Sequence, residues 1–163
     1  MLNLKTLKYH IVSYGKKKSF PHQIPHYGIY SIYNGRAYIP AVGEKKIVVI
    51  DLKTQKETDS VNPIGYPIFI IFSPNRGTIA VNYSGKEHNY LTLIDSKDMK
   101  VMKNIKAGRR IMFMAYSGNG RLIYASDYFG NSVNVFNIYT GKEIDRIPVQ
   151  SPSGIFRAPD YLW

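Results

Sequence analysis

The sequence has no cysteine, and this absence excludes several kinds of chemistry at once. Disulfide bonds, cysteine-ligated zinc or iron–sulfur sites and thiol nucleophiles all require this residue. There is also no run of about 18 apolar residues, the length that a membrane-spanning helix needs. The N-terminal residues lack the apolar segment of a secretory signal. We therefore expect neither thiol chemistry nor a membrane span.

Acidic residues are scarce. Eleven Asp and Glu stand against 22 Lys and Arg, which gives a formal net charge of +11. A surface of this sign attracts anions such as nucleic acid, anionic lipid or a polycarboxylate ligand. A nucleic-acid site would combine basic residues with exposed aromatic rings in a groove, whereas most tyrosines here occupy strand positions that should pack. The sequence therefore does not favour nucleic acid.

What is abundant indicates strands and turns. The 163 residues, enough for one domain, include 13 glycines, nine prolines and 14 tyrosines, together with many Val and Ile. Glycine and proline favour turns, and β-branched and aromatic residues favour strands. We expect an all-β fold.

Three segments of the chain repeat one pattern. Glycines that would form tight turns recur at 35, 77 and 120, which are 42 and 43 residues apart. An acid or amide that would open a turn also recurs, each time with a lysine five residues later, in the pairs Asp51/Lys56, Asp95/Lys100 and Asn137/Lys142. A fixed period of this length is typical of repeat architectures.

Each repeat contains four predicted strands, as in "PIFIIF", "RLIYAS" and "KIVVID" for the first three. The third strand is almost continuously apolar, which favours burial on both faces. Such a unit is a β-propeller blade. We predict complete blades at about residues 27–61, 67–105 and 111–149 and partial blades at 1–14 and 153–163, so that the chain is part of a larger propeller.

The segment "SKDMKVMKNIKAG" allows a second interpretation. Met99, Met102 and Ile105 fall at helical spacing, and Gly108 could end a helix. The Asp95/Lys100 register instead places these residues in the fourth strand of a blade, where Met99, Val101 and Ile105 alternate. We predict the strand.

In a propeller, the connections between blades and the loops between the second and third strands emerge on one face. Ligand-binding groups usually gather there. Candidates on these segments are His22, His26, Tyr66, Lys86, His88, Arg109, Arg110, Asp127 and Tyr128. The other face receives the lysines and arginines of the hairpin turns, Arg76 and Arg121 among them, which we interpret as keeping short hairpins soluble.

The sequence gives weaker signals for a metal site or a hydrolase site. The four histidines show no zinc-binding spacing such as H-E-x-x-H, and no serine lies in a G-x-S-x-G turn. Glu44, Glu87 and Asp127 could converge on the axis as the metal-binding carboxylates of a propeller lactonase, and the sequence leaves this alternative open.

The generic blade pattern looks like the YVTN-type propeller repeat. More specific are "IPHYGIYSIYNGRAYIPAVGEKKIVVIDLKT", "GYPIFIIFSPNRGTIAVNYS", "KNIKAGRRIMFMAYSGNGR" and "SPSGIF". Their order and spacing resemble the C-terminal portion of the NirF-type heme d1 biosynthesis proteins, whose propeller is similar to the d1 domain of cytochrome cd1 nitrite reductase. The similarity runs over about residues 1–156, under half of a full-length family member.

The resemblance implies an eight-bladed periplasmic propeller that binds heme d1 or its precursor and takes part in its maturation for nitrite reductase in denitrification. Nitrite reductase and other heme d1 maturation proteins are the implied protein partners. The P-H element puts the family's histidine at His26, which we assign as the catalytic acid/base or axial group. Other family positions fall at Gly65, Pro67, Phe69, Gly108, Arg109 and residues 152–156.

The sequence departs from the family at three places. A family His and a nearby Glu correspond to Phe113 and Ala115 here, and an acidic residue corresponds to Gly28. These replacements suggest a divergent binder or a relative with another ligand.

The ligand suits the charge of the chain, because heme d1 and its precursors carry several carboxylates. Arg109, Arg110 and Lys86 could pair with them, and Tyr66, Tyr83 and Tyr128 could cover the macrocycle. Two alternatives stay open: the d1 domain of a nitrite reductase, and a YVTN-type propeller that serves as an interaction scaffold without a cofactor.

Overall fold

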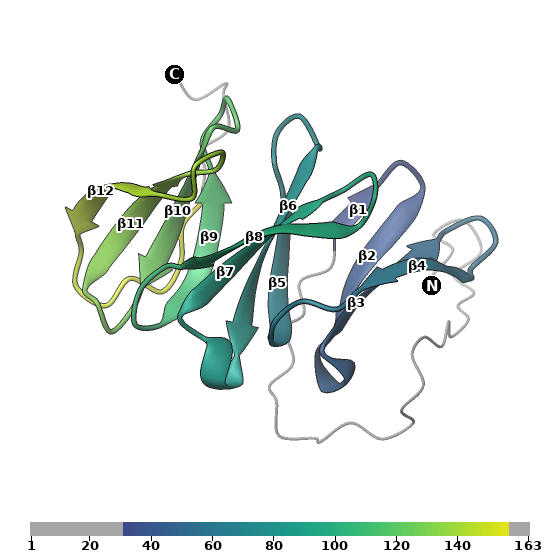
Figure 1. Ribbon diagram of the computed structural model, residues 1–163, viewed down its shortest axis with the longest axis horizontal. Helices are drawn as coiled ribbons and strands as arrows, with labels where there is room; N and C mark the ends of the chain where they lie inside the picture. Colours follow the sequence, from purple (N-terminus) through teal and green to yellow (C-terminus); the bar gives the residue numbers. More distant parts are fainter. Residues whose placement is uncertain (1–30, 157–163) are drawn as a thin grey trace, which may run out of the picture.

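The structure, a computed structural model, describes residues 31–156. Twelve strands in this range form three four-stranded antiparallel sheets, each with its strands in chain order. The sheets lie side by side (Figure 1), which is the arrangement of consecutive propeller blades. The all-β propeller fold predicted from the repeat is confirmed. The predicted partial blade at 1–14 and the end of the one at 153–163 lie outside the described residues.

The strands follow the repeat closely. The first sheet contains β1 (Ser31–Tyr33), β2 (Arg36–Ala41), β3 (Lys46–Asp51) and β4 (Glu57–Val61). The second contains β5 (Tyr66–Phe72), β6 (Thr78–Ser84), β7 (Tyr90–Asp95) and β8 (Lys100–Lys106), and the third contains β9 (Ile111–Tyr116), β10 (Leu122–Asp127), β11 (Ser132–Asn137) and β12 (Glu143–Pro148). Two short 3-10 helices, η1 (Val42–Glu44) and η2 (Gly85–Glu87), lie between the second and third strands of their sheets.

The turns between first and second strands are built alike in the last two sheets. Ser73 Oγ donates to Asn75 Oδ1 and accepts the N–H of Thr78, at 2.8 and 3.0 Å. Ser117 does the same with Asn119 and Leu122, at the same distances. The repeated Ser-x-Asn sequence therefore fixes the turn through its side chains.

The turns between third and fourth strands depend on the repeated acid or amide. Oδ1 of Asp51, Asp95 and Asn137 accepts backbone N–H groups two and three residues later. The fifth residue of each turn, Gln55, Met99 or Gly141, has a φ between 51° and 72°. The lysine then begins or precedes the fourth strand. The register shift after each turn is the bulge expected from the extra residue.

The segment that also fitted a helix is strand β8, as predicted. Lys100–Lys106 pairs with β7 over six registered positions, Tyr90↔Lys106 to Asp95↔Lys100. Met99 lies in the turn before it rather than in the strand. The local helical spacing is overridden because the strand completes the hydrogen-bond ladder of the sheet.

The third strands are buried on both faces, as their sequence predicts. The four central residues of β3, Ile47 to Ile50, are at most 3% exposed. Strand β3 lies between β2 and β4 in its sheet, so its N–H and C=O groups pair on both edges.

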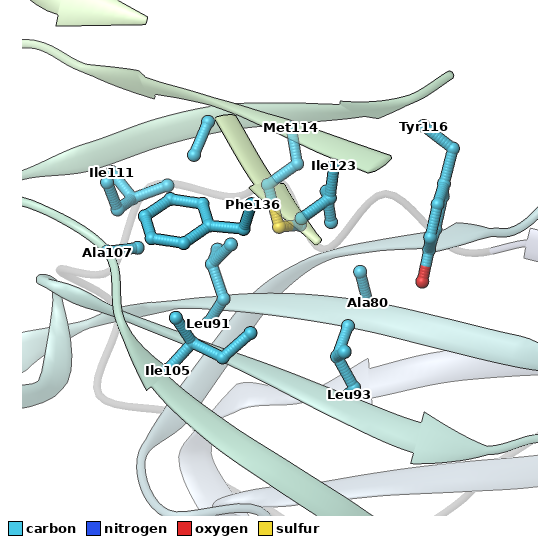
Figure 2. Close-up of a cluster of buried hydrophobic side chains, with 11 residues drawn as sticks. Ala80, Leu91, Leu93, Ile105, Ala107, Ile111, Met114, Tyr116, Ile123 and Phe136 are labelled. Carbon is cyan, nitrogen blue, oxygen red and sulfur yellow. The ribbon is translucent and has the colours of Figure 1, made fainter. Parts of the chain in front are cut away.

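Two apolar clusters hold neighbouring sheets together. Figure 2 shows the one between the second and third sheets, where the Phe136 ring of β11 lies near Leu91 of β7 and Ala107. Met114 of β9 and Ile123 of β10 complete its centre. A second cluster joins the first and second sheets through residues of β2, β3, β5, β6 and β7. Burial of these side chains, at about 25 cal/mol per Å² of apolar surface, makes the three blades one body.

A buried amide also ties the second sheet to the third. Asn82 of β6 is 0% exposed, and its Nδ2 donates to the carbonyl oxygens of Ile111 and Met112 in β9, at 3.2 and 3.1 Å. Its Oδ1 accepts the N–H of Phe69 at 3.0 Å. These bonds fix how far β9 is shifted along β5. They therefore also set the position of the connection that precedes β9.

Candidate functional site

The loops predicted to carry the ligand groups meet at the boundary between the second and third sheets. The N–H of Ile111 donates to His88 O and that of Tyr128 donates to Arg110 O, both at 2.9 Å. The N–H of Ala107 donates to Asn89 O at 2.8 Å. We call this cluster, residues 85–90, 107–111 and 127–131, the loop junction. It contains six of the nine predicted site residues: Lys86, His88, Arg109, Arg110, Asp127 and Tyr128.

Asp127 holds the loop junction together from inside. Its Oδ1 accepts the N–H groups of Arg109, Arg110 and Gly130 at 2.9, 2.8 and 3.2 Å. The residue is 1% exposed. Asp127 was predicted to contact the ligand. In the structure, its carboxylate binds the backbone of the loop that carries Arg109 and Arg110.

Two glycines make room for this carboxylate. A Cβ atom at Gly108 would lie 2.4 Å from Asp127 Oδ2, and one at Gly130 would lie 1.9 Å from it. Neither approach is sterically allowed, and the carboxylate cannot retreat without losing its N–H partners. Gly108 and Gly130 are therefore fixed by close approach to a side chain.

A cationic cleft of about 370 Å³ opens beside the loop junction. Its charged lining residues are Lys106, Arg109, Asp127, Glu143 and Arg146. Glu143 forms a bidentate pair with Arg146 at 2.8 and 2.9 Å, which raises the pKa of Arg146 above its usual value. Within residues 31–156, Lys106 and Arg109 have no carboxylate partner. The described part of the cationic cleft thus offers two cations without ion-pair partners to an anionic ligand.

His88 has a defined tautomer. Its Nδ1 lies 2.6 Å from Gly85 O. Because a carbonyl oxygen only accepts, Nδ1 carries the hydrogen, and in the neutral ring Nε2 keeps a free lone pair. His88 can therefore accept a hydrogen bond or ligate a metal through Nε2.

Tyr66 begins β5 beside the loop junction, where it pairs with Ser84 of β6 and its ring lies next to Gly85. The Lys45 ammonium stands 4.5 Å from the centroid of its ring, a cation–π contact. Tyr66 therefore lies at the side of the loop junction that faces Lys45 of the first sheet.

Tyr83 was predicted to cover the ligand, and this prediction is wrong. The residue is 0% exposed, and its hydroxyl donates to Thr92 Oγ1, which donates to Asn104. Burial raises the pKa of this hydroxyl well above its usual value. Tyr83 packs between the first and second sheets, in the apolar cluster that joins them, because its position in β6 faces the first sheet.

Three phenylalanine rings form an aromatic row that crosses from one blade to the next. The sequence alone did not single them out as a group. Phe69 of β5 and Phe113 of β9 have ring centroids 5.2 Å apart, and Phe113 and Phe156 have centroids 5.7 Å apart. The three positions are 44 and 43 residues apart, which is the period of the repeat. That period was the signal that could have found them.

Predicted groups of other kinds are not brought together. Among residues 31–156, no three His, Asp or Glu side chains lie close enough to hold a metal ion, so Glu44, Glu87 and Asp127 do not form the convergent carboxylates of a lactonase. His22 and His26 lie outside the part of the chain that the structure describes. No helix found in that part is long and apolar enough to span a membrane.

Comparison with known proteins gives consistent results. The sequence model of the cytochrome D1 heme domain family matches residues 9–160. Protein NirF of Pseudomonas aeruginosa is 30% identical over 142 residues, and protein NirF of Stutzerimonas stutzeri is 28% identical over the same length. Each alignment covers 87% of this chain and 36% of the relative. The chain thus spans about a third of the length of these curated relatives.

Solved structures share the fold. The dihydro-heme d1 dehydrogenase NirN, in complex with DHE, superposes with a TM-score of 0.66 at 23% identity, over 78% of this chain and 29% of that one. Hydrazine synthase of Kuenenia stuttgartiensis superposes with a TM-score of 0.65 at 18% identity, over 74% of this chain and 35% of that one.

Proposed function

Because the chain belongs to the cytochrome D1 heme domain family, we propose that it binds heme d1 or a heme d1 precursor and acts in heme d1 biosynthesis. The observation that carries the proposal is the family match over residues 9–160, together with Arg109 at the family's Gly-basic position, which has no ion-pair partner among residues 31–156. The NirF relatives support the same assignment.

The cationic cleft fits the carboxylates of such a ligand. Arg109 and Lys106 line it without an ion-pair partner in the described range. Arginine pairs with a carboxylate through two parallel hydrogen bonds, and Asp127 fixes the backbone of Arg109. Arg109 and Lys106 would therefore bind the ligand's carboxylates, and Arg110, Lys86 and Tyr128 would form the surrounding surface of the loop junction.

Binding rather than turnover is favoured by the residues of β9. Phe113 and Ala115, at the places of the family's His and Glu, offer neither a proton nor a metal ligand. We propose His26 as the acid/base or axial group and His88, through Nε2, as a second imidazole at the site. Tyr66 would contact the ligand only at its edge. We further propose that the three sheets are consecutive blades of an eight-bladed periplasmic propeller that works with nitrite reductase or other maturation proteins.

A spectroscopic titration tests the proposal. The full-length protein is titrated with heme d1, and we expect a saturable shift of the heme absorption bands. A Lys106→Gln/Arg109→Gln double variant should bind about tenfold more weakly or worse, because two charged hydrogen-bonding partners are removed. Lys97→Gln/Lys142→Gln is the matched control, since both lysines lie at hairpin turns outside the cationic cleft.

The outcomes separate the candidate functions. An unchanged spectrum with the wild-type protein would contradict tetrapyrrole binding and leave an interaction scaffold. Nitrite reduction by the heme d1-loaded protein, with an added electron donor, would establish the nitrite reductase alternative. Equal weakening by both double variants would mean that general charge attracts the ligand and that the cationic cleft does not bind it.

A further inference from the structure

Arg76, at the turn after β5, is held in place by several contacts. Its guanidinium carbon lies 5.4 Å from the centroid of the Tyr33 ring and 5.6 Å from that of the Phe72 ring. Its backbone has a φ of 62°, and its carbonyl oxygen accepts a hydrogen bond from Ser96 Oγ. A lysine or arginine that only keeps a hairpin soluble needs none of these contacts. The guanidinium is therefore oriented before any ligand arrives.

This guanidinium stands beside a hollow of about 320 Å³. Phe113, Met114, Ile71, Ile155 and Phe156 supply most of its apolar lining, and Arg76 is the only charged residue among the described residues that line it. We call it the aromatic hollow. An apolar surface with a single fixed cation is complementary to a flat apolar molecule that carries a carboxylate.

Of the two rings in the aromatic hollow that would contact a ligand, Phe113 is partly exposed and Phe156 is exposed. The Phe113 ring packs against the rings of Phe69 and Phe156 in tilted geometry, with interplanar angles of 59° and 33°. Phe156 is 86% exposed, and an aromatic ring so exposed gains from being covered. The row continues from the second blade to the third and beyond it, because its members follow the repeat.

We propose that the aromatic hollow binds the ring system of a carboxylate-bearing tetrapyrrole, which stacks on Phe113 and Phe156 and pairs one carboxylate with Arg76. The proposal rests on the proposed function and deepens it. It assigns ligand contacts to the first strands and to the turn after β5, whereas the cationic cleft lies at the opposite end of β9. It also assigns ligand binding to Arg76, which lies at a hairpin turn and which we interpreted from the sequence as a residue that keeps the hairpin soluble.

The first experiment tests the Arg76 contact. Arg76→Gln is compared with Arg121→Gln, which removes an exposed arginine from the corresponding turn of the third sheet without touching the aromatic hollow. The probes are heme d1 and its methyl ester, in which the carboxylates carry no charge. We expect Arg76→Gln to raise the Kd for heme d1 about five- to tenfold, and to leave the Kd for the ester within about twofold. Arg121→Gln should behave as the wild type with both probes.

The second experiment tests the stacking. Phe113→Leu and Phe156→Leu keep an apolar side chain but remove a ring, and Tyr139→Leu is the control, because Tyr139 is 68% exposed and lines neither the aromatic hollow nor the cationic cleft. We expect a several-fold rise in Kd with either probe for the two test variants, and a smaller shift of the heme absorption bands at saturation. Phe156→Leu guards against a folding effect, since its ring is mostly exposed.

The results distinguish this proposal from the one it rests on. If wild-type protein does not bind heme d1, the proposed function fails. If wild-type protein binds and the Lys106→Gln/Arg109→Gln variant is impaired, but Arg76→Gln, Phe113→Leu and Phe156→Leu bind normally, the proposed function stands and the aromatic hollow is a packing surface. An equal loss of affinity for heme d1 and its ester in Arg76→Gln would overturn the carboxylate contact.

Discussion

Asp127 illustrates how a buried charge can act through the backbone. One carboxylate oxygen accepts three N–H groups from two loops, and charged acceptors form stronger hydrogen bonds than neutral ones. These hydrogen bonds stabilise the loop junction. Any ligand contact made by Arg109 or Arg110 depends on this support.

Replacement of Asp127 should therefore reduce stability. Asp127→Ala leaves three N–H groups without their acceptor, and we expect the free energy of unfolding to fall by about 2–4 kcal/mol. Asp127→Asn keeps an oxygen acceptor and should cost less. Urea denaturation measures both, with Asp98→Ala as the control at an exposed acid. A stability of Asp127→Ala equal to that of the control would contradict the supporting role.

Asp95 makes a similar contribution in an exposed turn, and here the charge has a pH signature. Hydrogen bonds from the N–H groups of Asp98 and Lys97 lower the pKa of Asp95 below its usual value. A group whose pKa is lower in the folded state stabilises the protein fully above its unfolded pKa. That contribution is lost as the pH falls through the folded pKa. In the third sheet, Asn137 builds the same turn without a charge.

Asp95→Asn should thus change how the stability depends on pH more than it changes the stability at pH 7. At pH 7 we expect a melting temperature close to that of the wild type, because the amide oxygen can accept the same two N–H groups. Below about pH 4, the range in which an aspartate takes up its proton, the variant should lose less stability than the wild type. Thermal melts from pH 7 to pH 3 measure this, and parallel profiles for the two proteins would refute it.

At the scale of elements, the turn between third and fourth strands recurs with one constraint. Its fifth residue adopts a positive φ in each sheet, 60° at Gln55, 51° at Met99 and 72° at Gly141. For residues with a side chain, this conformation costs roughly 1–2 kcal/mol. Only the third sheet has the residue that avoids this cost. The first two turns must therefore be held by the rest of the sheet.

A reciprocal exchange tests this constraint. Gln55→Gly should stabilise the protein by about 0.5–1 kcal/mol, because the relief of strain exceeds the added freedom of the unfolded chain. Gly141→Ala should destabilise it by about 1–2 kcal/mol, and the added Cβ would also displace Lys103, because it would lie 2.6 Å from the Cδ of that lysine. Chemical denaturation gives both values. The same sign for both substitutions would count against the interpretation.

At the scale of the whole molecule, charge and shape act together. The formal net charge of the chain is +11. Some of its cations lie at the candidate sites: in the described range, the cationic cleft holds two cations without ion pairs, and the aromatic hollow holds one. Long-range attraction brings an anionic ligand to the surface, and the local cations then select its position.

The association rate should accordingly depend on salt. Between about 50 mM and about 500 mM salt the screening length shortens severalfold, and we expect the association rate constant for heme d1 to fall by a comparable factor. The uncharged methyl ester should show little change. Stopped-flow absorption measures both rates. Identical salt dependence for the two probes would exclude electrostatic steering.

The sequence by itself determined the blade architecture. Its repeat is carried by local signals: the Ser-x-Asn turns, the turn-opening Asp51, Asp95 and Asn137, and the apolar third strands. The turn signals act within a few residues, because their side chains bond to the nearby backbone, and the third strands are marked by their own apolar composition. For that reason the strand order, the turn positions and β8 were all predictable without tertiary information.

Only the tertiary structure decided what the candidate residues do. Asp127 is a support because Gly108, on another loop, closes over it, and Arg76 gains its orientation from Tyr33, on another sheet. Phe69, Phe113 and Phe156 become one row only when successive blades pack. These contacts join residues about 20 to 45 positions apart in sequence, and the packing between sheets that brings them together leaves no local pattern in the sequence.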